Sequence, residues 1–168
     1  VYMGPVITKA AAERHLQAVK EARELGKIVL GGRDLRTEPE YKNGNFVEPT
    51  IAELPRTARH FRDEFFSPFL AVTKFTDLSE AIAHANEADY GLTGGIYSED
   101  TKEIDQFFNT YQAGVLYANR QTGATTGAWP GVQPFCGWKG SGGGSGRGGC
   151  GPYYVQQFMR EQSRTVMR

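Results

Sequence analysis

The sequence has few cysteines, no long apolar segment and no excess of charge of either sign. Two cysteines, Cys136 and Cys150, are too few for a disulfide framework or a four-ligand zinc site, which favours a reducing compartment and predicts no metal site. No apolar run approaches the roughly 18 residues that a membrane span needs. The first residues also lack the basic and apolar regions of a secretory signal. We therefore expect a cytoplasmic protein without a membrane partner.

The balance of charge argues against a nucleic-acid partner. Lys and Arg together number 19, as do Asp and Glu, so the formal net charge is zero, whereas nucleic-acid binding gains most of its affinity from neutralising phosphates. Residues 144–149 match the dinucleotide pattern G-x-G-x-x-G. That pattern binds pyrophosphate only when a strand precedes it and a helix follows it. Here glycines precede it and Cys-Gly-Pro follows it, which is typical of a flexible loop.

Apolar periodicity predicts an α/β fold. Helices are expected over residues 8–25, 77–88 and 100–111, and strands over 27–31, 69–75, 94–97 and 115–118. Residues 45–54 are expected to form an extended segment that is broken at Pro49. The strand at residues 69–75 has the apolar composition of a buried strand. From residue 69 onward the order is β-α-β-α-β with short links, which implies parallel strands with right-handed crossovers. The predicted architecture is an open, mostly parallel sheet with flanking helices.

The segment after the last of these strands is the expected ligand-binding region. Residues 119–152 show little periodicity and form a longer loop than compact domains usually contain without a function. They also follow the carboxyl end of a parallel strand, where open sheets usually bind ligands. We expect residues 1–152 to form one α/β domain and residues 153–168 to form a tail. The tail alternates in part and predicts an exposed strand, which needs a partner.

Four residues, at three places in the chain, have both a functional and an ordinary structural interpretation. Glu64, ahead of residues 69–75, is either a carboxylate that accepts two ribose hydroxyl hydrogens or an exposed acid before a strand. Gly127 and Ala128 either hold a carboxylate with backbone N–H groups or form an ordinary turn. Cys136 would need a nearby base to act as a nucleophile, and no motif supplies one, so an inert thiol is favoured.

Three segments, in order along the chain, resemble motifs of the aldehyde dehydrogenase superfamily. Residues 4–7 (GPVI) are similar to its G-P-L-I, residues 64–68 (EFFSP) to E-x-F-G-P, and residues 133–142 (QPFCGWKGSG) to P-F-G-G-x-K-x-S-G. Residues 126–137 (TGAWPGVQPFCG) resemble the T-G-A-x-x-G-x-Q-P-F-G-G segment of one branch, the 1-pyrroline-5-carboxylate dehydrogenases. That branch oxidises L-glutamate γ-semialdehyde to L-glutamate with NAD, in proline catabolism.

The resemblance implies a role for five residues. Glu64 would hold the hydroxyls of the nicotinamide ribose of NAD, and Phe66 would pack near the nicotinamide. Gly127 and Ala128 would bind the α-carboxylate of the small-molecule substrate through backbone N–H groups. Phe135 would line the aliphatic stem of the aldehyde. Residues 119–152 would then be a substrate-anchor loop.

The resemblance also implies that this chain is the C-terminal part of a catalytic domain. The nucleophilic cysteine and the glutamate that activates water would lie before residue 1, so we expect no catalytic residue here and no turnover by the isolated chain. The tail, residues 153–168, would be an oligomerisation strand of a homo-oligomer. Two alternatives remain open: a non-catalytic assembly fragment, and an aldehyde dehydrogenase of different substrate specificity.

Two departures from the motifs predict local strain. Ser67 and Cys136 stand where the family patterns have glycine. We expect the Cβ of Ser67 to crowd the cofactor loop. We expect Cys136 to be strained by about 1 kcal/mol or more if its position requires a positive φ. Cys150 likewise interrupts the glycine run.

Overall fold

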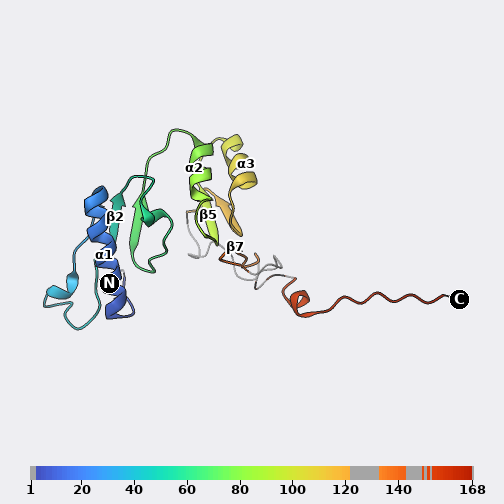
Figure 1. Cartoon of the computed structure of the whole chain (residues 1–168), viewed down its shortest axis with the longest axis horizontal. Helices are drawn as coiled ribbons and strands as arrows, with labels where there is room; N and C mark the ends of the chain where they lie inside the picture. The colour runs from blue at the N-terminus through green and yellow to red at the C-terminus, as the bar shows by residue number, and fades with distance from the viewer. Residues whose placement is uncertain (1–2, 122–132, 143–148, 150, 152, 168) are drawn as a thin grey trace. The chain divides into compact units, whose positions relative to one another are not determined.

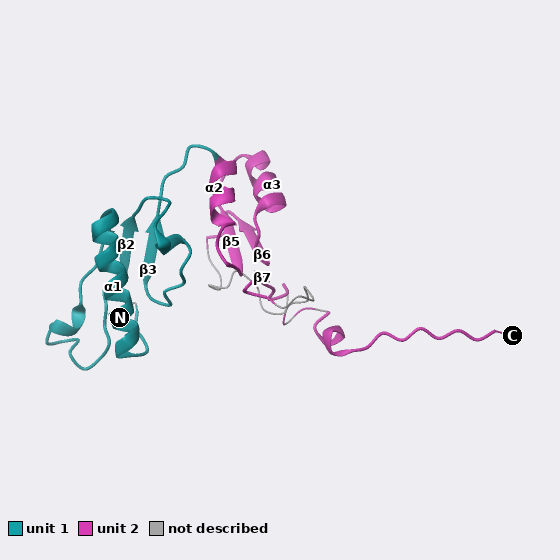
Figure 2. Cartoon of the chain, viewed as in Figure 1, with its two compact units in different colours: residues 1–77 teal, residues 78–168 magenta. Residues whose placement is uncertain are grey.

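The computed structural model describes residues 3–121, 133–142, 149, 151 and 153–167. The chain divides into two compact units, residues 1–77 (unit 1) and residues 78–168 (unit 2), shown in Figure 1 and Figure 2. Within the described ranges, no helix is both long enough and apolar enough to cross a membrane.

Unit 1 is a helix packed on a three-stranded sheet (Figure 1). Its elements are α1 (Lys9–Leu25), β1 (Lys27–Leu30), β2 (Thr50–Glu53) and β3 (Phe69–Val72), with short 3₁₀ helices at Leu35–Thr37 and Arg59–Phe61. Strand β2 is central, antiparallel to β1 and parallel to β3. The core cluster consists of small and medium apolar residues: Ala22, Ala52, Leu54 and Ala58. The alanines let the helix approach the sheet closely.

Local sequence signals set the ends of α1, as predicted. The helix starts where the Thr8 hydroxyl accepts a hydrogen bond from the Ala11 N–H at 3.1 Å, a standard N-cap. It ends at Gly26, whose N–H donates to the Ala22 carbonyl. A Cβ on Gly26 would lie 2.2 Å from the carbonyl oxygen of Glu53, so glycine permits the close approach of β2. The predicted helix over residues 8–25 is therefore confirmed to within one residue.

The expected strand at residues 69–75 differs from its prediction in length, burial and pairing. The strand stops at Val72, and the side chains of Leu70 and Phe75 are 54% and 57% exposed rather than buried. It pairs in parallel with β2, in the register Thr50↔Phe69, and not with the strands of unit 2. The prediction of one β-α-β-α-β sheet from residue 69 onward is therefore wrong for the described residues. Apolar composition identifies a strand, but neither its neighbour nor what covers it.

Unit 2 contains the remaining strands in two pairs. Its elements are α2 (Leu78–Ala85), β4 (Tyr90–Gly91), β5 (Thr93–Ile96), α3 (Thr101–Thr110), β6 (Val115–Ala118) and β7 (Trp138–Lys139). Strands β5 and β6 are parallel and are joined through α3, as expected, whereas β4 and β7 are antiparallel. Helices α2 and α3 lie side by side, with the Gln106 side chain donating to the Ser79 hydroxyl at 2.8 Å (Figure 1). The predicted α/β class is confirmed, with parallel and mixed sheets.

The tail does not form the expected strand in this single chain. Its described residues, 153–167, contain a 3₁₀ helix at Val155–Phe158 and otherwise no helix or strand. A terminal strand takes its backbone hydrogen bonds from a neighbouring strand, and none of the strands that the structure describes pairs with residues 153–167. The oligomerisation role of residues 153–168 stays a prediction, as does the domain boundary at residue 152.

Candidate functional site

Two of the five predicted site residues, Glu64 and Phe66, lie on the short segment of unit 1 that leads into β3. Both side chains are exposed. Phe135 lies in unit 2, ahead of β7. Gly127 and Ala128 lie outside the described residues. Glu64 and Phe66, two residues apart in the sequence, share the segment of residues 64–68, which we call the cofactor segment after the role predicted for it.

Phe66 combines two unfavourable features. Its φ is +50°, in the left-handed region that bulky side chains rarely adopt, and its ring is 82% exposed to solvent. A non-glycine residue in this region costs on the order of 1–3 kcal/mol and persists only where the surroundings fix it. Within unit 1, burial of the ring does not offset this cost. It is typical of a residue that is held ready for a ligand.

The residue before Phe66 is fixed by an aromatic cluster. The ring of Phe65 lies 5.3 Å from that of His60 and 5.8 Å from that of Phe69, measured between centroids. The guanidinium carbon of Arg59 lies 5.1 Å from the Phe65 centroid, within the range of a cation–π contact. His60 is itself buried, and its Nε2 lies 3.0 Å from the carbonyl oxygen of Ala18 in α1. Phe65 is thus joined to the interior of unit 1.

The guanidinium of Arg59 is hydrogen-bonded to two acidic side chains. Its guanidinium donates to Glu21 on α1, with Nε 2.8 Å from Oε2, and to Asp63. Hydrogen bonding to Arg59 lowers the pKa of Glu21 below its ordinary value, because the bond favours the charged carboxylate. The same contacts raise the pKa of Arg59, so the cation that covers Phe65 stays charged.

The residue after Phe66 is fixed by hydrogen bonds. The hydroxyl oxygen of Ser67 lies 3.3 Å from Nδ1 of His15 in α1. The N–H of Phe69 donates to the Ser67 carbonyl at 2.7 Å, and the N–H of Thr50 donates to the Pro68 carbonyl at 2.9 Å. The φ of Ser67 is not positive. The serine therefore fits into the segment through a hydrogen bond to the helix.

The segment around Phe135 is held in a different way. Phe135 forms an isolated antiparallel bridge with Gly149, through backbone hydrogen bonds of 2.8 and 2.9 Å, and its side chain is 41% exposed. The thiol of Cys136 lies 2.9 Å from the carbonyl oxygen of Gly114, and the φ of Cys136 is not positive. The condition for the strain predicted at Cys136, a positive φ, is therefore not met. A Cβ on Gly114 would lie only 2.1 Å from the Cys136 carbonyl oxygen, so the glycine makes the space here.

Sequence reasoning missed the role of Lys139. Its backbone has a φ of +52°, and its ammonium group donates to the carbonyls of Asn86 and Ala88 at 2.6 and 3.0 Å, just beyond the end of α2. Cations are favourable at this end of a helix because the free carbonyls carry partial negative charge. The Gly91 N–H also donates to the Ser141 hydroxyl at 3.1 Å. These contacts fasten the segment after Phe135 to unit 2.

Asn119 fixes the start of the predicted anchor loop. It follows β6 with a φ of +52°, a conformation that asparagine tolerates better than most residues. Its side-chain oxygen accepts from the Ser98 N–H at 2.9 Å and its side-chain nitrogen donates to the Ser98 carbonyl at 2.8 Å. These two bonds connect the chain after β6 to the chain after β5, just beyond the last paired residues of the two strands. The chain therefore enters residues 119–152 in a defined direction.

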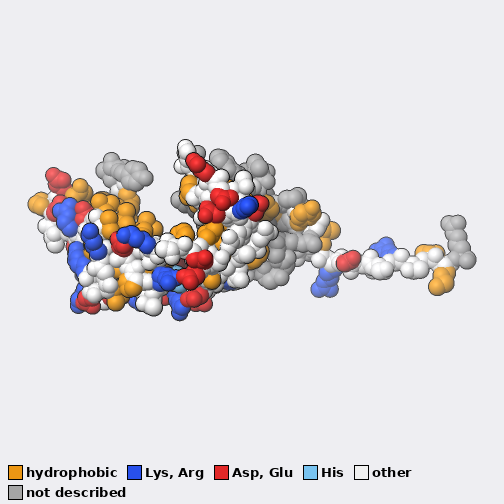
Figure 3. Space-filling model, turned by 90° about the horizontal axis from the view of Figure 1, so that it is seen from above, with side chains coloured by type: hydrophobic (Ala, Val, Ile, Leu, Met, Phe, Trp, Pro, Cys, Tyr) orange, Lys and Arg blue, Asp and Glu red, His pale blue; other side chains and the backbone are white. Residues whose placement is uncertain are grey.

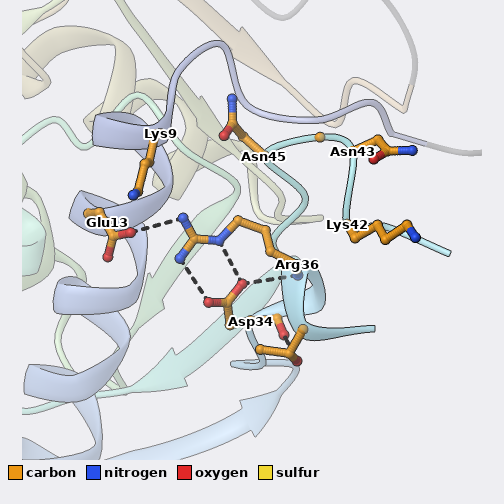
Figure 4. Close-up of a pocket in the computed structure, with 9 residues that line it drawn as sticks. Lys9, Glu13, Asp34, Arg36, Lys42, Asn43 and Asn45 are labelled. Atoms are coloured by element: carbon orange, nitrogen blue, oxygen red, sulfur yellow. Dashed lines mark hydrogen bonds and ion pairs between the residues drawn. The ribbon is translucent and has the colours of Figure 1, made fainter. Parts of the chain in front are cut away.

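A polar cavity of about 580 Å³ lies elsewhere in unit 1 and contains none of the predicted site residues (Figure 4). Its central cation, Arg36, donates to Asp34 from Nε and Nη2 at 2.8 Å and to Glu13 on α1 at 2.9 Å. Hydrogen bonding to Arg36 lowers the pKa of Asp34. Because the guanidinium already binds two carboxylates, this cluster fastens a loop to α1. Figure 3 likewise shows acidic and basic side chains interspersed rather than gathered by sign.

Comparisons with known proteins agree with the motifs. A model of the aldehyde dehydrogenase family matches residues 1–164. The 1-pyrroline-5-carboxylate dehydrogenase of Bacillus pumilus is 36% identical over 167 residues, which cover 99% of this chain and 30% of that protein. The chain thus spans less than a third of the length of such curated relatives.

Two solved structures of dehydrogenases that are named for different substrates share the fold of this chain. A 1-pyrroline-5-carboxylate dehydrogenase from Thermus with bound NAD has a TM-score of 0.71 and 36% identity, over 81% of this chain and 25% of that one. The γ-glutamyl-γ-aminobutyraldehyde dehydrogenase of Burkholderia cenocepacia has a TM-score of 0.76 and 31% identity, over 89% of this chain and 29% of that one.

The Lys139 contacts predict a stability effect. Replacing Lys139 with alanine removes two hydrogen bonds from a charged donor and should lower the free energy of unfolding by about 1–2 kcal/mol, visible as a lower melting temperature. Lys102→Ala is the matched control, because Lys102 is an exposed lysine of α3 whose side chain makes no hydrogen bond or ion pair with the described residues. Equal melting temperatures for the two variants would show that the Lys139 bonds do not stabilise unit 2.

Proposed function

Because this chain belongs to the aldehyde dehydrogenase family, we propose that it is the C-terminal part of an NAD-dependent oxidoreductase that converts L-glutamate γ-semialdehyde to L-glutamate in proline catabolism. The observation that carries this proposal is the cofactor segment, where an exposed carboxylate and an exposed ring stand on a backbone that is fixed on both sides. The names of the relatives and the NAD bound to the Thermus structure support it.

The residues of the cofactor segment suit the nicotinamide end of NAD. The carboxylate of Glu64 is exposed, and its two oxygens can accept hydrogen bonds from two neighbouring ribose hydroxyls. The ring of Phe66 is 82% exposed and can pack against a flat heterocycle, which would cover part of both apolar faces. When bound, NAD supplies the hydride acceptor. The chain's part is to hold the nicotinamide ribose in a fixed orientation.

The substrate would be held by the other three predicted residues. We propose that the backbone N–H groups of Gly127 and Ala128 bind the α-carboxylate and that Phe135 lines the aliphatic stem. Partial exposure of Phe135, on a segment fastened by its bridge to Gly149, supports this role. The nucleophile would come from a part of the protein outside this chain. Assembly through residues 153–168 and a cytoplasmic location belong to the same proposal.

An aldehyde dehydrogenase of different specificity is the main alternative. The Burkholderia relative has the same fold under another substrate name, at only slightly lower identity. The fold alone therefore does not determine which aldehyde is oxidised. A purely assembling fragment is the second alternative, and it predicts that the cofactor segment tolerates substitution.

The first test concerns the cofactor. In the full-length protein that contains this chain, Glu64→Gln keeps the side-chain size but removes the charged acceptor. The dissociation constant for NAD should rise roughly ten- to a hundredfold, the range expected when hydrogen bonds to a charged group are lost. Glu40→Gln, at another exposed glutamate of unit 1, is the control. An unchanged constant, measured by titration of protein fluorescence, would remove Glu64 from the site.

The second test concerns the aldehyde. The full-length protein should oxidise L-glutamate γ-semialdehyde with a kcat/KM at least about tenfold above that for butanal, because butanal lacks the carboxylate that backbone N–H groups would bind. The reaction is followed by NADH absorbance. Preference for the simple aldehyde would contradict the proposed specificity but would leave the family assignment in place.

The third test separates strain from binding at Phe66. Glycine adopts a φ of +50° without penalty, so Phe66→Gly should leave the melting temperature unchanged or raise it. The same substitution should raise the KM for NAD, because the packing ring is lost. Phe75→Gly is the control, since Phe75 is another exposed phenylalanine of unit 1 with no positive φ. A lower melting temperature in Phe66→Gly with an unchanged KM would mean that the ring serves folding instead.

A further inference from the structure

His15 links α1 to the cofactor segment from a buried position. Its side chain is fully buried, each ring nitrogen lies near one hydroxyl group, and the ring also interacts with the Glu48 carbonyl. Nδ1 lies 3.3 Å from the hydroxyl oxygen of Ser67, and Nε2 lies 3.4 Å from the hydroxyl oxygen of Thr50 in β2. The ring also packs edge-on against Phe69, with 6.3 Å between centroids. The imidazole thus bridges the helix, the central strand and the cofactor segment.

The surrounding hydrogen bonds determine which nitrogen carries the proton. The Thr50 hydroxyl donates its only hydrogen to the Glu48 carbonyl at 2.9 Å, so toward His15 it can only accept. Nε2 must therefore be the donor, and in a neutral ring Nδ1 is then an acceptor. Burial lowers the pKa of His15 and favours the neutral ring, with the Glu48 carbonyl acting in the opposite direction. The Ser67 hydroxyl consequently donates to Nδ1.

This bond acts on the backbone next to Phe66. Ser67 is the first residue after the strained φ of +50°, and Phe65, on the other side, is fixed by its aromatic cluster. Without the hydroxyl, the side-chain attachment of Ser67 to α1 is lost, and only the backbone hydrogen bonds of Ser67 and Pro68 hold this side of Phe66. A glycine at position 67 has no side chain that can make this contact. The serine therefore supplies an attachment that the glycine of the family pattern does not.

We propose that His15 is a positioning residue for the cofactor: by accepting the hydrogen bond of Ser67, it holds Phe66 in its left-handed conformation and so presents Glu64 and Phe66 to the nicotinamide ribose. The inference rests on the proposed function, since it assumes that NAD binds at this segment. It assigns His15 no contact with the cofactor. It predicts an effect on NAD binding that is separable from stability.

The test uses substitutions at both ends of the bond, in the full-length protein that contains this chain. Ser67→Ala removes the donor alone. His15→Gln places its amide near the former Nε2 and leaves Ser67 without an acceptor, whereas His15→Asn places its amide oxygen near the former Nδ1 and keeps one. Thr50→Val is the matched control, because it removes the other hydroxyl that faces the ring and leaves the Ser67 contact in place.

Ser67→Ala and His15→Gln should each raise the dissociation constant and the KM for NAD about three- to tenfold, the size expected for one neutral hydrogen bond. Neither should change kcat or the KM for the aldehyde at saturating NAD. The double variant should be no worse than either single one, since both remove the same bond. His15→Asn and Thr50→Val should stay within about twofold of the parent protein in NAD binding, whatever their melting temperatures.

The outcomes separate this inference from the proposed function. If Glu64→Gln weakens NAD binding while Ser67→Ala does not, the positioning role is wrong and the cofactor site stands. If Glu64→Gln has no effect, the proposed cofactor site fails whatever the His15 variants do. If His15→Asn weakens binding as much as His15→Gln, the ring acts through its bulk and the hydrogen-bond role is overturned. Ser67→Ala, at a partly exposed residue, keeps the test decisive should the His15 variants not fold.

Discussion

The candidate site depends on a backbone that is fixed on both sides of one strained residue. Phe66 has a positive φ and an exposed ring, so neither its conformation nor its burial favours the folded chain. The aromatic contacts of Phe65 and the hydrogen bond of Ser67 supply the compensating stability. Both attachments lead to α1, through Ala18 and His15, so the helix is the support on which the segment rests. For this reason the N-cap at Thr8 and the close approach of β2 at Gly26, which define the two ends of α1, also matter to the site.

The sequence identified the parts of the fold that local signals determine. The helix at residues 8–25 was predictable because its cap, its apolar spacing and its terminal glycine lie within the segment itself. The strand at residues 115–118 was predicted with the bounds it has. Pairing was not predictable in the same way, since β3 joins β2 across an intervening loop and no periodicity within residues 69–75 specifies that partner. The prediction that those residues are buried was wrong for the same reason.

The motifs singled out candidate site residues, but not the contacts that support them. The resemblance singled out Glu64 and Phe66, and the structure places both on one exposed segment. The contribution of His15 was invisible, because its partners Thr50 and Ser67 are 35 and 52 residues away in the sequence. The serine at position 67 was the one available signal, and it was interpreted as crowding rather than as a donor. Lys139 was likewise part of a motif whose physical role only the α2 carbonyls explain.

The contact between Cys136 and Gly114 bears on how such a segment can diverge. A side chain at position 136 has been accommodated, with its sulfur lying against the carbonyl of residue 114. Position 114 has no such latitude, because the carbonyl of residue 136 occupies the place of any Cβ there. Tolerance to substitution in this pair is therefore one-sided: position 136 accepts a cysteine, whereas a Cβ at position 114, before β6, would clash with the carbonyl of residue 136.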